Sequence, residues 1–597
     1  MGKNISGVSV KGAASGYAKL QKFLHVLLLL GTILAAIKVI FVDYSMDEEY
    51  QIVMGYRHLT GDAWFGAMWE PHQTSAYLVT ALMWIYHSLL GTYTGVVLYL
   101  RVITTLIQLG LSWWLFLVTA RFLEKEEAVL IALLYFNIVP KLIQIPEFGN
   151  LQVWFWTGLT VCFLEYETHP KAAGKPLWIW LAGICMALEI LSYPSAILVF
   201  PLALIYLCLR GKKDEQPKNA IRNPLRFCGA CALCAAVWAL LIFSQVSPDE
   251  FLRNLPRIVT FDLTHDLALP MGARLLTLLQ GFGWECLLLL LSVLCSGVIF
   301  ALASAISKKR RKISLPSLLT KGQLITLLSL LTMIATLMIQ FVYWAILRRG
   351  FELPQIHLFA PLLLSLILRP YAGEKKKYLT FGLLSAVLTL LAVLYMSDLT
   401  FPYAVPHAML GSLFGIILAV MALREQFGSS GSALIRLLLI CFVFLCIFGK
   451  GFTLRGGRGN DITQVAGIMK HGPAAYVLGD YMCAYIYNSN YEDFRNTIPQ
   501  DAKVLIVTNM VFSPGTTPYM FTDAEICHFS IVDPTSYDER LLTYWEDYPE
   551  KRPDVIVVDC WYGQLMEDPD NWIMQYIEND FGYTEVRDGK YVRFYLK

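Results

Sequence analysis

Three acidic residues, Asp47, Glu48 and Glu49, stand together directly after the first apolar run of the sequence, which covers residues 23–42. Carboxylates at a membrane surface are costly unless they are solvated, paired or used. In a cavity of low dielectric the pKa of a carboxylate rises, which suits it to act as a general base. The cluster predicts a catalytic base, with Asp47 and Glu48 as the candidates, or alternatively a hydrated loop edge.

Arg348 and Arg349 offer the complementary chemistry. They lie in the segment LRRGFELPQIHLFAPLL, in a connection that is otherwise poor in positive charge. Because a guanidinium group presents a planar fork to phosphate oxygens, we expect this pair to bind a phosphate group. His72 would add a positive charge there when protonated. Arginines that bind lipid headgroups, and a histidine at the membrane interface, are the structural alternatives.

Further polar residues are candidates for secondary substrate binding, namely Arg57, Glu70, Glu147 and His357. Structural alternatives exist for two of them. Arg57 could form a salt bridge with Glu48 or Glu49 in the same loop, and His357 could be an interfacial histidine. As an acid, Glu147 is a weaker candidate than Asp47.

One group of residues has the composition of a metal site. Asp262, His265 and Asp266 are spaced to share one face of a helix, and could hold a divalent metal such as Mg²⁺ or Mn²⁺. A proline-rich loop of this composition is more typical of a solvated surface. No GxGxxG or P-loop pattern opens a helix, so nucleotide binding is not predicted.

The composition identifies the class of protein that must position these residues. Of 597 residues, 56% are hydrophobic and 16% are charged, against about 25% charged in globular chains. Soluble, disordered, collagen-like and coiled-coil classes are excluded, which leaves a polytopic α-helical membrane protein surrounded by lipid. The formal net charge of +2 argues against a nucleic-acid partner.

Thirteen apolar runs are long enough, or nearly so, to span a membrane. They cover residues 23–42, 95–117, 128–143, 152–166, 177–192, 195–209, 227–244, 280–303, 322–346, 356–369, 379–396, 408–423 and 433–449. The connections 210–226, 308–312 and 369–377 are strongly basic, so they and the N-terminus are expected in the cytoplasm. Lys38 is expected to extend its ammonium group outward.

An odd number of spans places everything after residue 449 outside. The predicted organisation is therefore a membrane domain, residues 1–449, and an extracytoplasmic domain, residues 450–597. The first external loop covers residues 43–94, and its apolar part, 74–90, is expected to lie in the outer leaflet or to be re-entrant. In the C-terminal domain, runs 502–509 and 554–559 predict strands, and 536–547 and 571–579 predict helices. Such alternation predicts an α/β domain.

The first external loop also carries a recognisable order of motifs: DEEYQ, GDAWF, EPHQTSAYL, LLG and YLRV. This order resembles the GT-C glycosyltransferases of the bacterial protein O-mannosyltransferase and aminoarabinose-transferase group. The resemblance covers roughly residues 20–170, and the thirteen spans with an external C-terminal domain are similar to the aminoarabinose-transferase architecture. It implies a cell-envelope enzyme that moves a sugar from a polyprenyl-phosphate donor to an acceptor hydroxyl on the external face, with inversion.

Two departures from that group affect the candidate site. The group's Lys-Pro-Pro-Leu segment is replaced by residues 71–74, PHQT, which lack the lysine thought to meet the donor phosphate. Asn150 occupies the slot in the second external loop where the group usually carries an acid. Arg101 matches the group's Arg-Leu helix start, which implies a structural role.

The sequence leaves the acceptor open among a lipid, a protein and a polysaccharide. It also leaves two other classes of function as alternatives. One is a transporter or flippase, against which the lack of an obvious inverted repeat argues. The other is a non-catalytic cell-envelope assembly protein with a degenerate catalytic loop.

Overall fold

The protein is described here by a computed structural model. It covers residues 7–44, 46–70, 72–138, 143–169, 175–212, 218–259, 271–311, 315–347, 355–396, 404–454, 461–499, 502–507, 525–526, 538–559 and 572–597.

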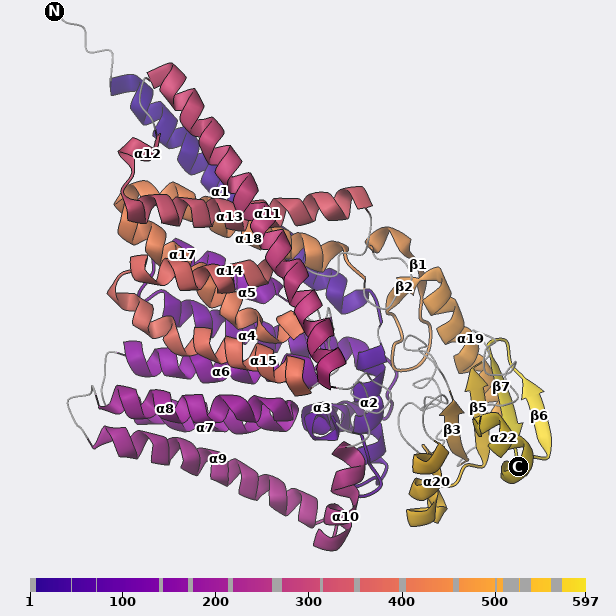
Figure 1. Ribbon diagram of the computed structural model, residues 1–597. Coiled ribbons are helices and arrows are strands. Elements are labelled where there is room, and N and C mark those ends of the chain that lie inside the picture. The colour runs from indigo at the N-terminus through magenta and orange to yellow at the C-terminus, as the bar shows by residue number, and fades with distance from the viewer. Residues whose placement is uncertain are drawn as a thin grey trace, which may run out of the picture.

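The membrane domain is a bundle of long helices that run side by side (Figure 1). Each of the thirteen expected spans coincides with one of them. They are α1 (Gly7–Phe41), α4 (Val96–Thr119), α5 (Lys125–Asn137), α6 (Phe148–Thr168), α7 (Lys175–Ser192), α8 (Val199–Gly211), α9 (Asn219–Phe243), α11 (Met271–Arg311), α13 (Lys321–Leu347), α14 (Gln355–Leu368), α15 (Thr380–Met396), α17 (Met409–Phe427) and α18 (Ser432–Phe452).

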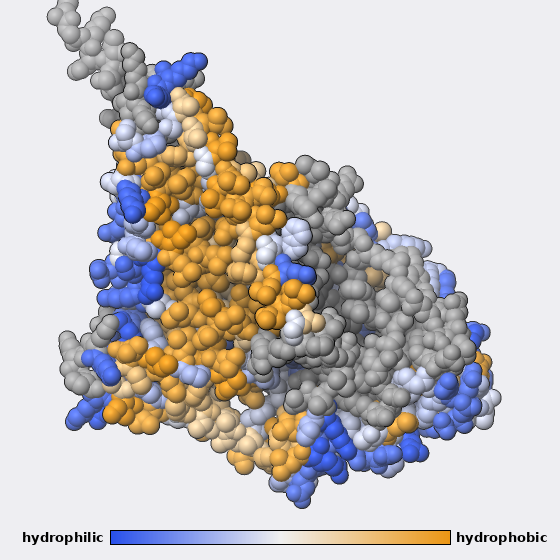
Figure 2. Space-filling view, in the orientation of Figure 1, coloured by the Kyte–Doolittle hydropathy of each residue, from blue (hydrophilic) through white to orange (hydrophobic). Residues whose placement is uncertain are grey.

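Nine stretches of the described residues are long and apolar enough to cross a membrane, and one of them, Met409–Phe452, contains both α17 and α18. Of the thirteen bundle helices, three lie outside these nine stretches, namely α5, α6 and α14. Of these, α5 has 13 residues and α14 has 14. Almost every residue of α6 is buried, so this helix contacts protein rather than lipid. An apolar band covers the visible face of the bundle (Figure 2), as expected of a surface that meets lipid.

Short helices form a layer at one end of the bundle, which we call the domain side because the C-terminal domain packs there (Figure 1). They are α2 (Met46–Leu59), the 3-10 turn η1 (Gln73–Ala76), α3 (Tyr77–Leu90) and α10 (Pro248–Val259). At 14 residues, α3 is too short to span a bilayer. Trp84 and Leu89 are exposed on it, by 61% and 77%. This agrees with the expectation that residues 74–90 do not cross the membrane.

The C-terminal domain is an α/β unit, as its sequence predicts. A two-stranded antiparallel sheet pairs β1 (Val465–Ile468) with β2 (Leu478–Asp480). A five-stranded sheet has the order β4-β3-β5-β7-β6. Its strands are β3 (Lys503–Val507), β4 (Glu525–Ile526), β5 (Val555–Asp559), β6 (Glu585–Asp588) and β7 (Val592–Leu596). The strand β3 runs parallel to β4 and β5, whereas β7 is antiparallel to β5 and β6.

Three helices accompany these sheets, α19 (Tyr481–Thr497), α20 (Asp538–Asp547) and α22 (Trp572–Tyr576). The expected strands in 502–509 and 554–559 are confirmed as β3 and β5. The expected helices in 536–547 and 571–579 are confirmed as α20 and α22, the second of which continues into a π-helical turn, Ile577–Phe581. Consecutive apolar residues of β3 and β5 are buried on both faces, which is typical of central strands.

The C-terminal domain and the first loop share a hydrophobic core. One cluster joins Ile52 and Val79 to Met469 and Tyr487, and another joins Trp69 to Tyr544. Backbone hydrogen bonds reinforce the contact: Gly95 N donates to Gly472 O at 2.9 Å, and Val97 N to Pro473 O at 3.0 Å. The loop after α1 is therefore built into both parts of the molecule.

Lys38 differs from expectation. Its side chain is 7% exposed, and its ammonium group donates to the carbonyl of Thr453, the residue that caps the C-terminus of α18. Lys450 similarly binds a carbonyl group at the C-terminal end of α5, where its Nζ donates to Phe136 O at 3.1 Å. A cation is favoured at the negative end of a helix dipole, which is the physical reason that Lys38 turns inward.

Candidate functional site

The acidic triplet lies in the first turn of α2, which begins at Met46. Negative side chains are favoured at this end of a helix because the free backbone N–H groups and the helix dipole are positive there. Glu48 and Glu49 are buried, with 2% and 1% exposure. The side chain of Asp47 lies outside the described part of the structure, so only its position on the backbone of α2 is known.

Arg101 binds Glu48 and the chain that precedes α2. Its Nε donates to Glu48 Oε1 at 2.9 Å and its Nη2 to Glu48 Oε2 at 2.7 Å. The same guanidinium group donates to the carbonyls of Ile40, Val42 and Asp43 at 3.1, 3.4 and 2.5 Å. It is 2% exposed. We call this arrangement the Arg101 clamp; it fixes the connection that leads into Asp47.

A second buried guanidinium group, that of Arg57, organises the far end of α2. Its Nε donates to Asp62 Oδ2 at 2.6 Å and its Nη1 to Glu70 Oε1 at 2.5 Å. Lys551 of the C-terminal domain binds the other oxygen of Asp62 at 2.6 Å. Burial alone would lower the pKa of Arg57, but the carboxylates of Glu70 and Asp62 raise it above its ordinary value.

The proposed salt bridge between Arg57 and Glu48 or Glu49 is therefore wrong. Eight or nine residues separate them on one straight helix, a rise of about 12 Å, which is beyond the reach of an ion pair. Arg57 instead folds onto the GDAWF turn that follows α2.

The GDAWF turn is rigidly held. Gly61 has a φ of +119°, a conformation that a residue with a Cβ atom rarely adopts. The ring of Trp64 stacks on His58 at 3.9 Å, and Phe65 N donates to the side chain of Gln73 at 2.7 Å. Burial lowers the pKa of His58, against the opposing effect of its contact with the backbone carbonyl of Asp62.

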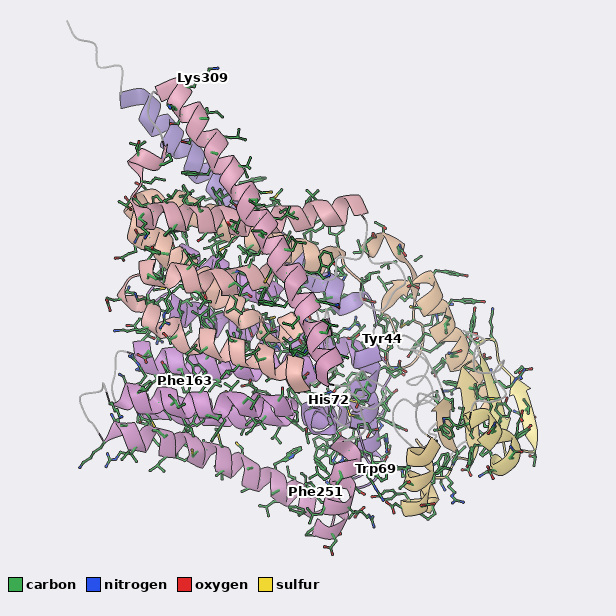
Figure 3. All side chains as sticks on the ribbon, in the orientation of Figure 1. Tyr44, Trp69, His72, Phe163, Phe251 and Lys309 are labelled. Carbon is green, nitrogen blue, oxygen red and sulfur yellow. The ribbon has the colours of Figure 1, made fainter. Side chains whose placement is uncertain are left out.

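Glu147 and His72 meet at the domain side of α6. Glu147 caps this helix, its carboxylate accepting from Gly149 N at 2.7 Å and from Asn150 N at 2.6 Å. The ring of His72 stacks on Phe148 with 4.1 Å between centroids. Two candidates from different loops are therefore neighbours, and Figure 3 shows His72 on the boundary between the bundle and the first loop.

His407 joins this group, although no sequence motif marks it as a candidate. It is fully buried in the turn before α17, and its Nδ1 lies 2.5 Å from Gln152 Oε1. A Cβ atom on Gly149 would lie 2.9 Å from Glu147 Oε1 and 3.4 Å from His407 Cε1. Because Gly149 has no side chain, the Glu147 carboxylate and the His407 ring can both lie close to its backbone. A lone histidine in a loop offered no spacing signal.

The remaining candidates fall outside the described part of the structure. These are Arg348, Arg349, Asp262, His265 and Asp266, together with the side chain of His357. Among the described residues, no three His, Cys, Asp or Glu side chains are grouped so that they could hold a metal ion. Within the described site, the first loop provides buried ion pairs, and the domain side of α6 provides the capping carboxylate of Glu147.

Comparisons with known proteins give structural matches only. No protein-family profile matches the chain, and no curated protein sequence does. An oligosaccharyltransferase from Archaeoglobus fulgidus, crystallised with Zn and sulfate, matches with a TM-score of 0.46 and 12% identity over 94% of this chain and 71% of that one.

ArnT from Cupriavidus metallidurans, crystallised with undecaprenyl phosphate, matches with a TM-score of 0.40 and 11% identity over 98% of both chains. A structure of the archaeal oligosaccharyltransferase AglB, in complex with an inhibitory peptide and a dolichol-phosphate, matches with a TM-score of 0.43. Nine apolar helical stretches among the described residues independently make the chain a multi-pass helical membrane protein.

Proposed function

We propose that this protein is a glycosyltransferase that moves a sugar from a polyprenyl-phosphate donor to an acceptor hydroxyl at the domain side of the membrane. The observation that carries the proposal is the Arg101 clamp. It ties the YLRV motif to the DEEYQ motif, so two segments of the resemblance form one unit that orients the first turn of α2. The GDAWF and EPHQTSAYL segments join through Arg57, which binds Asp62 and Glu70.

The proposed reaction is a direct displacement with Asp47 as the general base. Its carboxylate removes the proton from the acceptor hydroxyl while the hydroxyl oxygen attacks the anomeric carbon from the face opposite the phosphate. The bond between that carbon and the phosphate oxygen breaks, and the configuration inverts. The electron pair leaves with polyprenyl phosphate, whose developing charge needs cationic groups. Arg348, Arg349 and protonated His72 are the proposed donors to it.

Glu48 has a positioning role in this scheme. Both of its oxygens accept hydrogen bonds from Arg101, which commits this carboxylate to a structural contact. Glu147 is likewise committed to the N-terminus of α6. These commitments favour Asp47 over the other two as the base.

The proposed orientation follows the charge of the connections. The loops that carry Arg210, Lys309 and Lys376 lie on the cytoplasmic side, with the N-terminus, and the C-terminal domain lies outside. Figure 3 shows Lys309 far from the layer that contains Tyr44, Trp69 and His72. This separation supports a candidate site on the external face, where a lipid carrier would present its sugar.

The test is a reaction in lipid nanodiscs. The purified protein is incubated with polyprenyl-phosphate mannose and other polyprenyl-phosphate sugars, and release of polyprenyl phosphate is followed by chromatography. The proposal predicts donor cleavage that rises when an envelope extract is added as the source of acceptor. Donors that all remain intact, with and without that extract, would contradict it and favour the transporter or assembly alternatives.

A further inference from the structure

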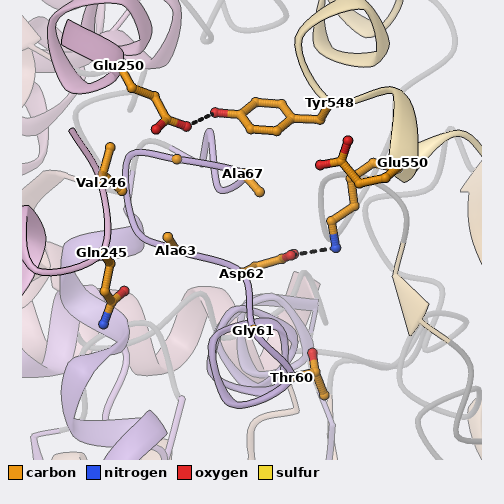
Figure 4. Close-up of a pocket in the computed structure, with 12 residues that line it drawn as sticks. Thr60, Gly61, Asp62, Ala63, Ala67, Gln245, Val246, Glu250, Tyr548 and Glu550 are labelled. Atoms are coloured by element: carbon orange, nitrogen blue, oxygen red, sulfur yellow. Dashed lines mark hydrogen bonds and ion pairs between the residues drawn. The ribbon is translucent and has the colours of Figure 1, made fainter. Parts of the chain in front are cut away.

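A pocket of about 260 Å³ lies where the first loop meets the C-terminal domain (Figure 4). The loop contributes Thr60 and Asp62, the end of α9 contributes Gln245, and α10 contributes Glu250. The C-terminal domain closes the opposite wall with Tyr548 and Glu550. Both parts of the molecule are needed to form the pocket, which is the usual location for a ligand site in a protein of two parts.

The walls of this junction pocket are fixed without a ligand. Lys551 pairs with Asp62 across the junction at 2.6 Å. Tyr548 donates its hydroxyl to Glu250 Oε1 at 2.6 Å and accepts from Asn254 Nδ2 at 3.0 Å. Asn254 also donates to the carbonyl of Phe65 at 2.8 Å. A ligand would therefore enter a site that needs little ordering on binding, which favours affinity.

The lining has an excess of hydrogen-bond acceptors. Glu250 and Glu550 present carboxylate oxygens, and among the described residues neither forms an ion pair. Lys551, the one cationic side chain among the described lining residues, is paired with Asp62. A carboxylate accepts but cannot donate, so the ligand must supply several donors. Sugar hydroxyl groups do this, and a volume just below that of drug-sized pockets suits one sugar ring.

The pocket is far from the proposed reaction centre. Asp47 stands in the first turn of α2, whereas Thr60 and Asp62 follow its last turn. Thirteen residues of α-helix rise about 20 Å between them. A ligand in the pocket cannot offer its own hydroxyl group to Asp47.

We propose that the junction pocket binds a sugar unit of an extended, hydroxyl-rich acceptor, about 20 Å from the hydroxyl group that reacts. The identification of this unit as part of the acceptor rests on the proposed glycosyl transfer. A sugar site in the junction pocket narrows the acceptor to a glycan, free or lipid-linked, that is long enough to reach from the pocket to Asp47. It also gives the C-terminal domain a role, because that domain supplies half of the pocket.

The experiment measures sugar binding directly, on the full-length protein in nanodiscs. Saturation-transfer NMR is recorded with methyl mannoside, methyl glucoside and methyl galactoside as probes. Gln245→Trp fills the mouth of the pocket from an exposed position, and Ser244→Trp places the same ring on the adjacent exposed residue outside the lining. Glu550→Gln removes one carboxylate without touching the Asp62–Lys551 pair.

The wild type and Ser244→Trp are expected to show saturation of at least one sugar. Gln245→Trp should lower that signal at least five-fold, and Glu550→Gln should lower it by a smaller factor. No saturation by any of the three sugars, or equal signals from Gln245→Trp and the wild type, would overturn the assignment. Calorimetric binding of Ca²⁺ that is lost in Gln245→Trp, together with no binding of any sugar, would overturn it in favour of a cation site.

Donor cleavage is measured on the same samples, which separates the two proposals. Sugar binding without donor cleavage would contradict the glycosyl transfer and leave the sugar site in place. Donor cleavage without sugar binding would contradict only the sugar site. Ser244→Trp, which lies outside the pocket lining, is expected to leave cleavage of the donor by water unchanged.

Discussion

Arg101 holds Glu48 through two parallel hydrogen bonds of 2.9 and 2.7 Å, in a position where both side chains are almost fully buried. An arginine and a carboxylate in this arrangement fix each other's orientation as well as their charge. Since Glu48 is the neighbour of Asp47, the pair determines where the first turn of α2 begins. The acid beside the proposed base is thus an anchor for it.

Arg101→Gln should lower the rate of sugar transfer about a hundred-fold, because small misplacements of a catalytic group have effects of this size. Donor affinity should change little, since the proposed mechanism assigns the clamp no contact with the donor. The measurement is a separate determination of kcat and KM for the donor. Arg101→Lys, which keeps the charge but loses the fork, should be impaired to an intermediate extent.

Arg121→Gln is the matched control for the Arg101 clamp. Arg121 lies just beyond the opposite end of α4 and binds Glu165 at 2.6 Å, so the substitution removes a similar pair from the other side of the membrane domain. It should leave kcat within about two-fold of the wild type. An equal loss of kcat in the two variants would show that Arg101 acts only through stability.

Arg57→Met should destabilise the junction between the first loop and the C-terminal domain. Removing one partner of a buried ion pair leaves the other charge unpaired, at a cost of about 3–5 kcal/mol. Here Asp62 would retain Lys551, but Glu70 is fully buried and would lose its guanidinium partner. Hydrogen exchange should therefore increase in α2 and α20, and an unchanged exchange pattern would contradict the prediction.

Glu147 offers a test between a capping and a catalytic role. As a cap it accepts two backbone N–H bonds, and Glu147→Ala should cost about 1 kcal/mol of stability. Glu147→Gln keeps one acceptor oxygen and should retain most of the transfer activity. A loss of activity in Glu147→Gln comparable to that of a base variant, with unchanged thermal stability, would instead identify Glu147 as the base.

His58 makes the first loop sensitive to acid. Burial lowers the pKa of His58 below its ordinary value, so at mildly acidic pH the unfolded chain binds a proton that the folded protein excludes. Stability is therefore lost as the pH falls through the ordinary histidine range toward the lowered pKa. The apparent unfolding temperature should fall less between pH 7.5 and pH 5.5 in His58→Phe than in the wild type. An equal fall in the two proteins would contradict this.

The helices of the membrane domain could be predicted from sequence because hydropathy is a local property. Each of the thirteen expected runs is a helix, and the α/β texture after residue 450 was visible in β-rich runs such as 502–509. What the sequence could not show is how polar side chains choose partners. The ammonium group of Lys38 was expected to extend outward, yet it is buried and donates to the carbonyl of Thr453, more than four hundred residues away.

In the candidate site, too, the residue types could be predicted from sequence, whereas the partners of the side chains could not. The acids and the arginine of the first loop could be identified by type, but their pairing depends on the fold. Arg57 binds Asp62 and Glu70 rather than Glu48, because a straight helix separates it from the acidic triplet. His407 could not be found at all, since only the packing of α6 against the turn before α17 places it near Glu147.

The most direct test of the proposed mechanism is the transfer rate of Asp47→Asn in nanodiscs with a polyprenyl-phosphate sugar that the wild type cleaves. The substitution preserves size and removes the base, so the rate should fall by at least about a hundred-fold, with donor binding and unfolding temperature unchanged. Glu48→Gln, measured beside it, should retain a larger share of the activity. A transfer rate for Asp47→Asn within a few-fold of the wild type would contradict the account.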